Sequence, residues 1–172
     1  MAAIQVTDQA QPDTQPDPMA LRRAFGSFPT GVTVLTTIDT DGRPRGMTAN
    51  AFASVSLQPA LLLGCVGHGA ASFPAFAQCR AFAVNVLRDD QQDVSGLFAS
   101  KSTLKFANVS YTMRRTGSPV LTDCLTWFDC TVHQRVHAGD HTVLFGRIKQ
   151  FDTSHAAPLG FSRGRYAEVR PR

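Results

Sequence analysis

The sequence lacks several features that mark membrane, secreted and metal-binding proteins. Within its 172 residues, no apolar run approaches the roughly 20 residues that a helix needs to cross a bilayer. The N-terminal segment has neither the basic region nor the apolar region of a signal peptide. The four cysteines form no CxxC pair and have no zinc-finger spacing, which argues against a disulfide scaffold and a structural zinc site. We therefore expect a cytoplasmic protein whose cysteines are free thiols.

A strong excess of one charge is also missing. Lys and Arg number 17 and Asp and Glu number 13, which leaves a formal net charge of only +4. The basic residues are scattered, apart from a group near the end made of Arg163, Arg165, Arg170 and Arg172. They lack the interleaved aromatic residues that are common on nucleic-acid-binding surfaces. We therefore expect neither a nucleic acid nor a membrane as a partner.

The length is typical of one domain with a single hydrophobic core. Residues 1–18 are rich in Gln, Asp and Pro and have little to bury, so they are predicted to form a disordered N-terminal arm. The remaining residues, 19–172, are predicted to form one folded domain. Between Met19 and Phe28 apolar residues recur at helical spacing, which predicts a short amphipathic helix that ends before Pro29.

Most of the folded domain has the pattern of antiparallel strands. Gly31–Ile38 is rich in β-branched residues, and an Asp-Gly turn signal leads from it into a long strand-like stretch, Gly46–Val66. A second long hairpin is predicted from Leu125 onward, with its turn at "HAGD", residues 137–140. Many antiparallel strands separated by a few short helices predict a mainly β protein, built as a barrel or a sandwich.

The stretch that begins at Gly46 has a polar side where a buried strand would be apolar. Alternation along a strand places on this side Thr48, Asn50, Phe52, Ser54 and Ser56. A solvated strand face usually carries Lys, Glu or Arg, and this side has none of them. Short hydroxyls and an amide suit the close approach of a flat polar ligand, with an ordinary solvated face as the alternative.

Asn85 raises the same question, because it lies in the middle of the predicted strand Ala81–Leu87 among residues that resemble a core. A buried amide without hydrogen-bond partners costs on the order of 1–3 kcal/mol. Two interpretations stay open: the amide bonds to neighbouring backbone, or it faces a ligand.

A dinucleotide-binding fold is one alternative for the middle of the chain. Gly67-x-Gly69-x-x-Ser72 follows a predicted strand, and Asp89 comes about 20 residues later, as in the Rossmann fingerprint. The third glycine is a serine, however, Pro74 interrupts the short helix, and no second strand-helix-strand unit follows. A parallel sheet is therefore not expected.

A metal site is a second alternative, because His133, His137 and His141 are four residues apart and would stack on a helix. The surrounding pattern is that of strands, and a turn separates the last two histidines. We therefore expect no bound metal.

Six short motifs follow one another along the chain. They are FPTGVTVLTT (Phe28–Thr37), GMTANAFASVSLQP (Gly46–Pro59), FAVNVL (Phe82–Leu87), LFA followed by KF (Lys105 and Phe106), GDH (Gly139–His141) and GRY (Gly164–Tyr166). Motifs of this kind occur in the same order in flavin reductase-like proteins of the FMN-binding split-barrel class. The chain therefore resembles this family over nearly all of the expected folded domain. The resemblance implies an antiparallel split β-barrel with Greek-key connections and short helices.

Members of that family are typically homodimers, and many are the reductase component of two-component flavin monooxygenases. They use NADH or NADPH to reduce FMN or FAD, and the reduced flavin then diffuses to a separate monooxygenase. The resemblance thus implies an NAD(P)H-dependent flavin reductase. Two alternatives share the barrel: a flavin- or haem-binding protein without turnover, and a pyridoxamine-phosphate oxidase, whose second basic cluster is not found in this sequence.

The resemblance also assigns residues to the flavin. Against the ring it places Met47, Thr48, Ala49 and Asn50. Along the ribityl chain it places Ser54, Val55 and Ser56. Toward the phosphate it places the loop Gly64–Ser72, with Cys65 and Ser72, and the pair that closes the site, Lys105 and Phe106. It adds to the cofactor site Asn85 and Phe98.

For the nicotinamide, the matched positions are His141, Arg165 and Tyr166. Of these, His141 is the one candidate for a catalytic residue. Two departures from the family pattern, Ala60 in place of a second proline and Ala51 in place of a serine, leave open whether the flavin is FMN or FAD.

The chemistry explains why the sequence shows no obvious catalytic pair. Hydride transfer between a nicotinamide and a flavin uses reactive atoms of the two cofactors, so the protein has to stack them and exclude water. Backbone N–H groups near Thr48–Asn50 could stabilise charge on the flavin ring, and Lys105 could bind its phosphate.

Overall fold

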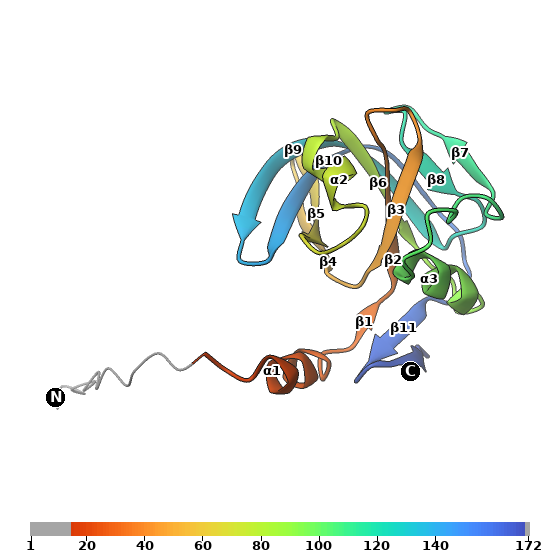
Figure 1. Ribbon diagram of the computed structural model, residues 1–172. Coiled ribbons are helices and arrows are strands. Elements are labelled where there is room, and N and C mark those ends of the chain that lie inside the picture. Colours follow the sequence, from red (N-terminus) through yellow and green to blue (C-terminus); the bar gives the residue numbers. More distant parts are fainter. Residues whose placement is uncertain (1–14, 171–172) are drawn as a thin grey trace, which may run out of the picture.

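A computed structural model describes residues 15–170 (Figure 1). Its body is a seven-stranded sheet with the strand order β3-β2-β6-β9-β10-β5-β4. These strands are β2 (Thr33–Ile38), β3 (Pro44–Ala49), β4 (Phe52–Leu57), β5 (Ala60–Gly67), β6 (Ala81–Val86), β9 (Thr126–Ala138) and β10 (His141–Thr153). Most of the predicted N-terminal arm, residues 1–14, lies outside the described residues.

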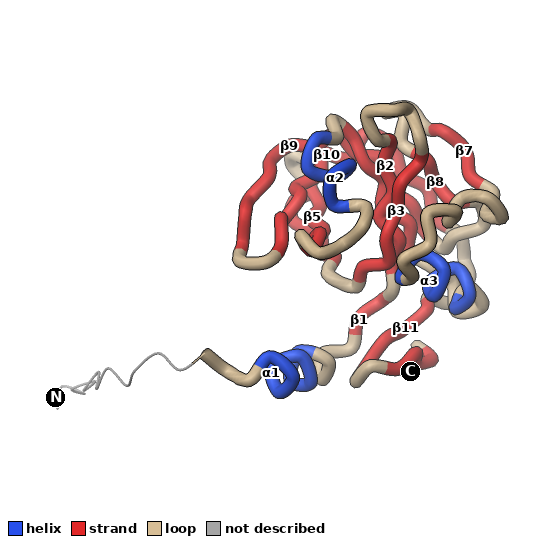
Figure 2. Tube along the Cα trace, in the orientation of Figure 1, coloured by secondary structure: helices blue, strands red, loops and turns tan. Residues whose placement is uncertain are grey.

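Within residues 15–170, two smaller sheets and three short helices complete the fold (Figure 2). The three-stranded sheet contains β1 (Thr30–Gly31), β11 (Leu159–Ser162) and β12 (Arg165–Glu168). The two-stranded sheet contains β7 (Tyr111–Met113) and β8 (Pro119–Leu121). The helices are α1 (Pro18–Phe25), α2 (Phe73–Gln78) and α3 (Gln92–Ala99). Every strand pairing within residues 15–170 is antiparallel, which excludes the parallel dinucleotide-binding fold.

The link between β3 and β4 closes the large sheet into a barrel. These two strands lie at opposite edges of the sheet, yet only Asn50 and Ala51 connect them. A fully extended chain spans at most about 3.6 Å per residue, so Ala49 and Phe52 are no more than about 11 Å apart. The two edges therefore meet at this link and separate beyond it, which confirms the predicted antiparallel split barrel.

The same link corrects one prediction about the stretch from Gly46. The prediction treated this stretch as one long strand whose polar side continues from Thr48 to Ser56. The structure divides this stretch into two strands on opposite edges, and a register shift between Ser54 and Ser56 interrupts β4 again. Alternation is a local property, so it could not show where the chain leaves one edge for the other.

Apolar side chains pack on both sides of β2. Leu35 belongs to a cluster inside the barrel, together with Leu62, Phe82, Val84 and Leu144. Val34, the preceding residue, belongs to a second cluster beneath α3, together with Leu87, Phe98, Leu121 and Leu159. Both faces of β2 are therefore covered, one by the barrel and the other by α3 and neighbouring strands.

The predicted second hairpin is confirmed, because β9 and β10 pair over nearly their whole length. Gly139 has a φ of 60° between the two strands, in the left-handed region that glycine adopts without strain. The tip of this hairpin carries His137 at the end of β9 and His141 at the start of β10.

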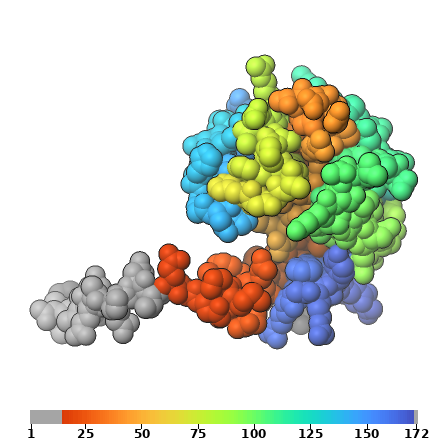
Figure 3. Space-filling model, viewed as in Figure 1, coloured from red at the N-terminus to blue at the C-terminus, as the bar shows by residue number. Residues whose placement is uncertain are grey.

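Helix α1 lies apart from the barrel and beside the C-terminal strands (Figure 3), where the carbonyl of Gly26, just after the helix, accepts a hydrogen bond from the Arg163 N–H. The Asp17 side chain caps its first turn, and it ends at Phe25, three residues earlier than predicted. It buries none of its residues. No helix within residues 15–170 is both long enough and apolar enough to span a membrane, and the cytoplasmic location stays a prediction.

Candidate functional site

Two neighbouring pockets lie along β3, which is an edge strand of the barrel sheet. The first, which we call the lysine pocket, holds about 400 Å³ with its open mouth and is lined by Pro44, Arg45, Gly46, Ala71, Ser72, Ser102, Thr103, Lys105 and Phe106. The second, the tyrosine pocket, holds about 520 Å³ and is lined by Val32, Thr48, Ala49, Asn50, Ser95, Ala99, Phe161 and Tyr166. Edge strands present backbone groups that no neighbouring strand uses, so both pockets border potential donors and acceptors.

Lys105 is the most unusual side chain of the lysine pocket, because it is a buried cation. Only 8% of the residue is exposed, and its Nζ donates to the carbonyl oxygens of Phe98 at 2.7 Å and Gly46 at 3.2 Å. No carboxylate pairs with it within the part of the chain that the structure describes. Desolvation lowers the pKa of this ammonium from its ordinary value. A buried ammonium without a counterion is costly, so the pocket is suited to an anion such as a phosphate.

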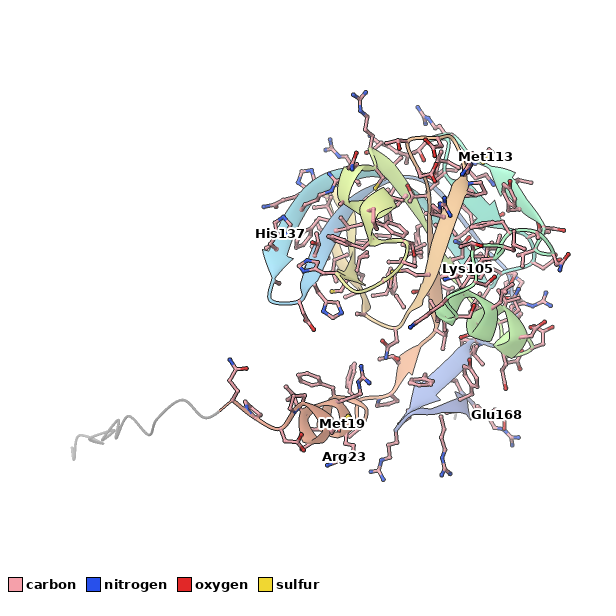
Figure 4. The ribbon with its side chains drawn as sticks, viewed as in Figure 1. Met19, Arg23, Lys105, Met113, His137 and Glu168 are labelled. Atoms are coloured by element: carbon pink, nitrogen blue, oxygen red, sulfur yellow. The ribbon has the colours of Figure 1, made fainter. Side chains whose placement is uncertain are left out.

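Figure 4 shows Lys105 between β3 and α3, close to the strand that carries Gly46. The Gly46 carbonyl also accepts a hydrogen bond from the Ser72 hydroxyl at 3.1 Å. Ser72 is itself buried and precedes α2, so one backbone carbonyl of β3 joins α2 to the segment that follows α3. These bonds fix the walls of the lysine pocket.

Gly46 is required at this position because no side chain fits there. A Cβ atom would lie 2.7 Å from the Phe98 ring and 3.0 Å from the Leu35 carbonyl oxygen. Contacts this short force Phe98 to move, and Phe98 is fully buried beneath α3.

We expect Gly46→Ala to lower the free energy of unfolding by about 1–3 kcal/mol, which is the usual cost of overpacking a core. Urea unfolding followed by circular dichroism measures this change. Gly69→Ala is the matched control, because a Cβ at that exposed glycine meets no atom within 4 Å. Equal stability of the two variants would contradict the tight packing of Phe98 on β3.

A short chain of hydrogen bonds connects three of the elements that form the tyrosine pocket. The Tyr166 hydroxyl on β12 donates to the Ser95 Oγ at 3.0 Å, and the Thr48 hydroxyl on β3 donates to the Ser95 carbonyl at 2.6 Å. The rings of Phe161 and Tyr166 meet edge to face, with centroids 5.8 Å apart. Aromatic walls beside an edge strand suit a flat ring with polar groups on its rim.

The structure brings seven of the predicted site residues to these two pockets. The tyrosine pocket contains Thr48, Ala49, Asn50 and Tyr166. The lysine pocket contains Ser72, Lys105 and Phe106. Met47 lies between the two groups on β3, and its partly buried side chain packs against the barrel core.

Apart from Met47 and Asn85, five predicted cofactor residues line neither pocket. Ser54, Val55 and Ser56 lie on β4, the edge strand opposite β3, and Cys65 lies on β5. Phe98 is 1% exposed and fills the core beneath α3. The expectation that these residues contact the flavin stays a prediction.

Asn85 is fully buried on β6, and its amide is used within the protein. Its Nδ2 donates to the Val34 carbonyl at 2.9 Å and to the Thr36 hydroxyl at 3.1 Å, and its Oδ1 accepts from the Leu121 N–H at 2.8 Å. The structure therefore corrects the predicted cofactor contact. The amide joins β8 to β2 and β6, and it has no surface on which a ligand could lie.

The predicted nicotinamide residues are placed differently from one another. His141 lies at the exposed start of β10, where its Nδ1 is 2.7 Å from an Asp140 carboxylate oxygen. Hydrogen bonding to His141 lowers the pKa of the Asp140 carboxyl. Arg165 immediately precedes Tyr166 on β12, so its side chain points to the opposite face of that strand. Only Tyr166 of the three lines either pocket, and the nicotinamide contacts of the other two stay predictions.

The three evenly spaced histidines lie on two paired strands and do not stack as they would on a helix. Across residues 15–170, no three His, Cys, Asp or Glu side chains are arranged to hold a metal ion.

Sequence reasoning missed several pocket residues, among them Arg45, Ser95 and Phe161. Arg45 immediately precedes the Gly46 motif and could have been noticed there. Ser95 and Phe161 come from α3 and β11, and only the packing of these elements against β3 brings them to the tyrosine pocket.

The chain is similar to known proteins. It matches the model of the flavin reductase like domain over residues 25–170. It is 47% identical over 146 residues to the reductase component of the flavin-dependent trigonelline monooxygenase of Acinetobacter baylyi, a match that covers 85% of this chain and 47% of that protein. It is 40% identical over 156 residues to the reductase subunit HsaB of a flavin-dependent monooxygenase of Rhodococcus jostii, which covers 90% of this chain and 80% of that protein.

The fold of the chain is also similar to that of a solved structure. The NADH:FAD oxidoreductase SgcE6 of Streptomyces globisporus, in complex with NAD and FAD fragments, is 36% identical and has a TM-score of 0.84. The match covers 92% of this chain and 98% of that chain. The chain spans about half the length of two of the curated relatives that it matches.

Proposed function

The chain belongs to the flavin reductase like domain family, and from this premise we propose that it is an NAD(P)H:flavin oxidoreductase. Its substrates are NADH or NADPH and a flavin, FMN or FAD. One observation carries the proposal beyond membership of the family: the buried Lys105 ammonium has no carboxylate partner within residues 15–170 and lines a pocket beside β3. A phosphate-bearing flavin supplies the anion that this ammonium lacks.

The two pockets suit the two ends of a flavin mononucleotide unit. The phosphate fits the lysine pocket, where Lys105 and the Ser72 hydroxyl are fixed by the Gly46 carbonyl. The ring fits the segment Thr48–Asn50 at the free edge of β3, beside the aromatic wall of the tyrosine pocket.

When bound, the flavin accepts a hydride from the reduced nicotinamide, and the protein contributes position and electrostatics. Backbone N–H groups of β3 can stabilise negative charge that develops at the rim of the ring. Phe161 and Tyr166 restrict the water that can reach the ring from the side of β11 and β12. Removing water strengthens those electrostatic contacts, because the local dielectric constant falls.

The proposed product is a reduced flavin that leaves for a separate monooxygenase. Two relatives are a reductase component and a reductase subunit of flavin-dependent monooxygenases, which supports such a partner for this chain. A diffusing flavin needs no large docking surface between the two proteins.

One assay tests the activity directly. Consumption of NADH and of NADPH is followed by absorbance with FMN, FAD or riboflavin supplied in turn. Turnover that depends on added flavin is expected. Tight flavin uptake without turnover would favour the alternative of a non-catalytic flavin-binding protein, and neither uptake nor turnover would overturn the proposal.

We also propose a homodimer, in which a second copy covers apolar surface that a single chain exposes. Phe25 and Phe28, at the end of α1 and just after it, are 70% and 75% exposed, and Leu57 at the end of β4 is 92% exposed. An eight-residue helix that buries nothing is marginal in water, since isolated helices need about 12–15 residues to persist. Contact with a second chain would stabilise it.

Introducing Asp at Phe25 and Phe28 together is expected to raise the dissociation constant of the dimer by about tenfold or more, because two charges would enter an apolar contact. Sedimentation velocity over a range of concentrations measures the change. Arg22→Asp on the same helix is the control, since it adds the same side chain at an already polar position. A monomeric wild-type protein, or a double variant that dimerises normally, would contradict this role of α1.

A further inference from the structure

A third pocket continues from the lysine pocket past Arg45. This adjoining pocket holds about 680 Å³ with its open mouth and is lined by Asp39, Thr40, Arg45, Ala71, Ser72, Pro74, Ala75 and Gln78. Three of these residues, Arg45, Ala71 and Ser72, also line the lysine pocket. The two pockets therefore share a boundary at which the Arg45 side chain is present.

Arg45 is held at this boundary by one of its nitrogens only. Its Nε donates to the Asp39 carboxylate at 2.7 Å, and the arginine side chain is 33% exposed. The two terminal nitrogens make no hydrogen bond to any residue between 15 and 170. An arginine in this arrangement offers further N–H donors to an anion in a fixed direction.

Asp39 fixes that direction because it is itself held by the turn between β2 and β3. Its carboxylate accepts from the backbone N–H groups of Asp41 and Arg43, both at 2.9 Å. The hydrogen bond from the Arg43 backbone, followed by that from the Arg45 side chain, lowers the pKa of the Asp39 carboxyl. Asp39 therefore stays ionised at neutral pH and keeps the Arg45 side chain in place.

FMN and FAD differ in the part of the molecule that this boundary would meet. FMN ends in one phosphate, whereas FAD continues through a second phosphate to an adenosine. Lys105 in the lysine pocket can neutralise the first phosphate, and the free nitrogens of Arg45 are the next donors along the same surface. Beyond Arg45, the adjoining pocket offers the apolar surface of Pro74 and Ala75 with the polar groups of Thr40 and Gln78.

We propose that Arg45 binds the second phosphate of FAD, that the adenosine lies in the adjoining pocket, and that the protein therefore prefers FAD to FMN. This inference rests on the proposed function, since it assumes that the flavin phosphate occupies the lysine pocket. It names Arg45 as the residue that discriminates between the two flavins.

Flavin fluorescence titrations of the full chain test the proposal with FAD, FMN and riboflavin. The wild-type protein is expected to bind FAD about tenfold more tightly than FMN, as one additional charge-assisted contact would give. Arg45→Met is expected to remove this difference and to leave FMN affinity within about twofold. Arg43→Met is the matched control, because Arg43 is exposed on the same turn and lines neither pocket.

A second variant keeps the proposal testable if Arg45→Met loosens the turn at Asp39. Ala75→Phe is distant from that ion pair along the chain and fills the adjoining pocket, so it should weaken FAD binding and spare FMN. Equal affinity of the wild-type protein for FAD and FMN would overturn the inference but not the proposed function. Absence of binding for every flavin would instead overturn the proposed function.

The 2′-phosphate of NADPH is another anion that Arg45 could bind, and the same variants separate the two. If Arg45→Met raised the KM for NADPH alone and left the preference for FAD intact, the assignment to the second flavin phosphate would be wrong. An unchanged ratio of NADH to NADPH turnover together with a lost preference for FAD would support it.

Discussion

Replacing Lys105 with methionine is expected to raise the dissociation constants of both FMN and FAD by about tenfold or more, because a charge-assisted contact to the phosphate is lost. Lys105 lies at the lysine pocket with its ammonium buried against two carbonyl oxygens. Riboflavin has no phosphate, so its affinity should change little. Fluorescence titration with the three flavins measures the difference.

Lys101→Met is the control for this variant, because Lys101 is exposed in the same segment after α3. The Lys105 variant should fold with nearly the stability of the wild-type protein, because removal of a buried charge offsets the loss of two hydrogen bonds to carbonyl oxygens. Equal losses of affinity for riboflavin and FMN would show that Lys105 supports the pocket without contacting the phosphate.

The pH dependence of flavin binding follows from the same ammonium. Desolvation places the pKa of Lys105 below its ordinary value in the flavin-free protein, and a bound phosphate would raise it again. Affinity for FMN should therefore fall as pH rises through the pKa of the flavin-free protein, whereas affinity for riboflavin should not.

The stability of the flavin-free protein should change with pH in the opposite sense. Between the lowered pKa and the ordinary pKa of lysine, the unfolded chain binds more protons than the folded chain, so the free energy of unfolding rises with pH. Chemical unfolding at several alkaline pH values measures this contribution, and Lys105→Met should abolish it. If Lys105→Met left the pH dependence of the free energy of unfolding unchanged, Lys105 would not be its source.

Asn85→Ala is expected to lower the free energy of unfolding by about 3 kcal/mol, which is large for a single substitution. The change removes the amide hydrogen bonds to the Val34 carbonyl and the Thr36 hydroxyl, and it leaves the Leu121 N–H without its side-chain acceptor. It also leaves a cavity in β6, where the residue is completely buried. Thermal and urea unfolding both measure the loss.

Asn108→Ala provides the comparison for this prediction, since Asn108 is exposed and should change stability by less than about 0.5 kcal/mol. The folded fraction of the Asn85 variant should bind flavin with nearly the affinity of the wild-type protein. Normal stability combined with lost flavin binding would instead restore the cofactor contact that the resemblance assigned to Asn85.

The long strands of the two hairpins could be predicted because their signals are local, whereas the short strands β7, β8, β11 and β12 were not predicted. β-branched residues with an Asp-Gly turn indicated β2 and β3, and the long alternating segments around "HAGD" indicated β9 and β10. The division between β3 and β4 could not be predicted, because a two-residue link at Asn50 and Ala51 resembles a continuing strand. Pairing across opposite edges of a sheet depends on residues distant in the chain.

The residues of the candidate site could likewise be predicted only in part. Thr48, Lys105 and Tyr166 belong to motifs of the family, and the structure places each of them at one of the two pockets. Asn85 also belongs to a motif, but its role follows from Leu121 and Thr36, which lie 36 and 49 residues away along the chain. A motif therefore indicates that a residue is needed and leaves open whether a ligand or the core needs it.

From the sequence by itself came the strand content, the family and the expectation of a flavin, because each depends on residue types in a fixed order along the chain. Only the tertiary structure decided which polar groups have partners. It gave the Asn85 amide three partners inside the core, and among residues 15–170 it gave the Lys105 ammonium only carbonyl oxygens. It also placed Arg45 between two pockets, because closure of the barrel, rather than any local pattern, determines which surfaces along β3 remain open.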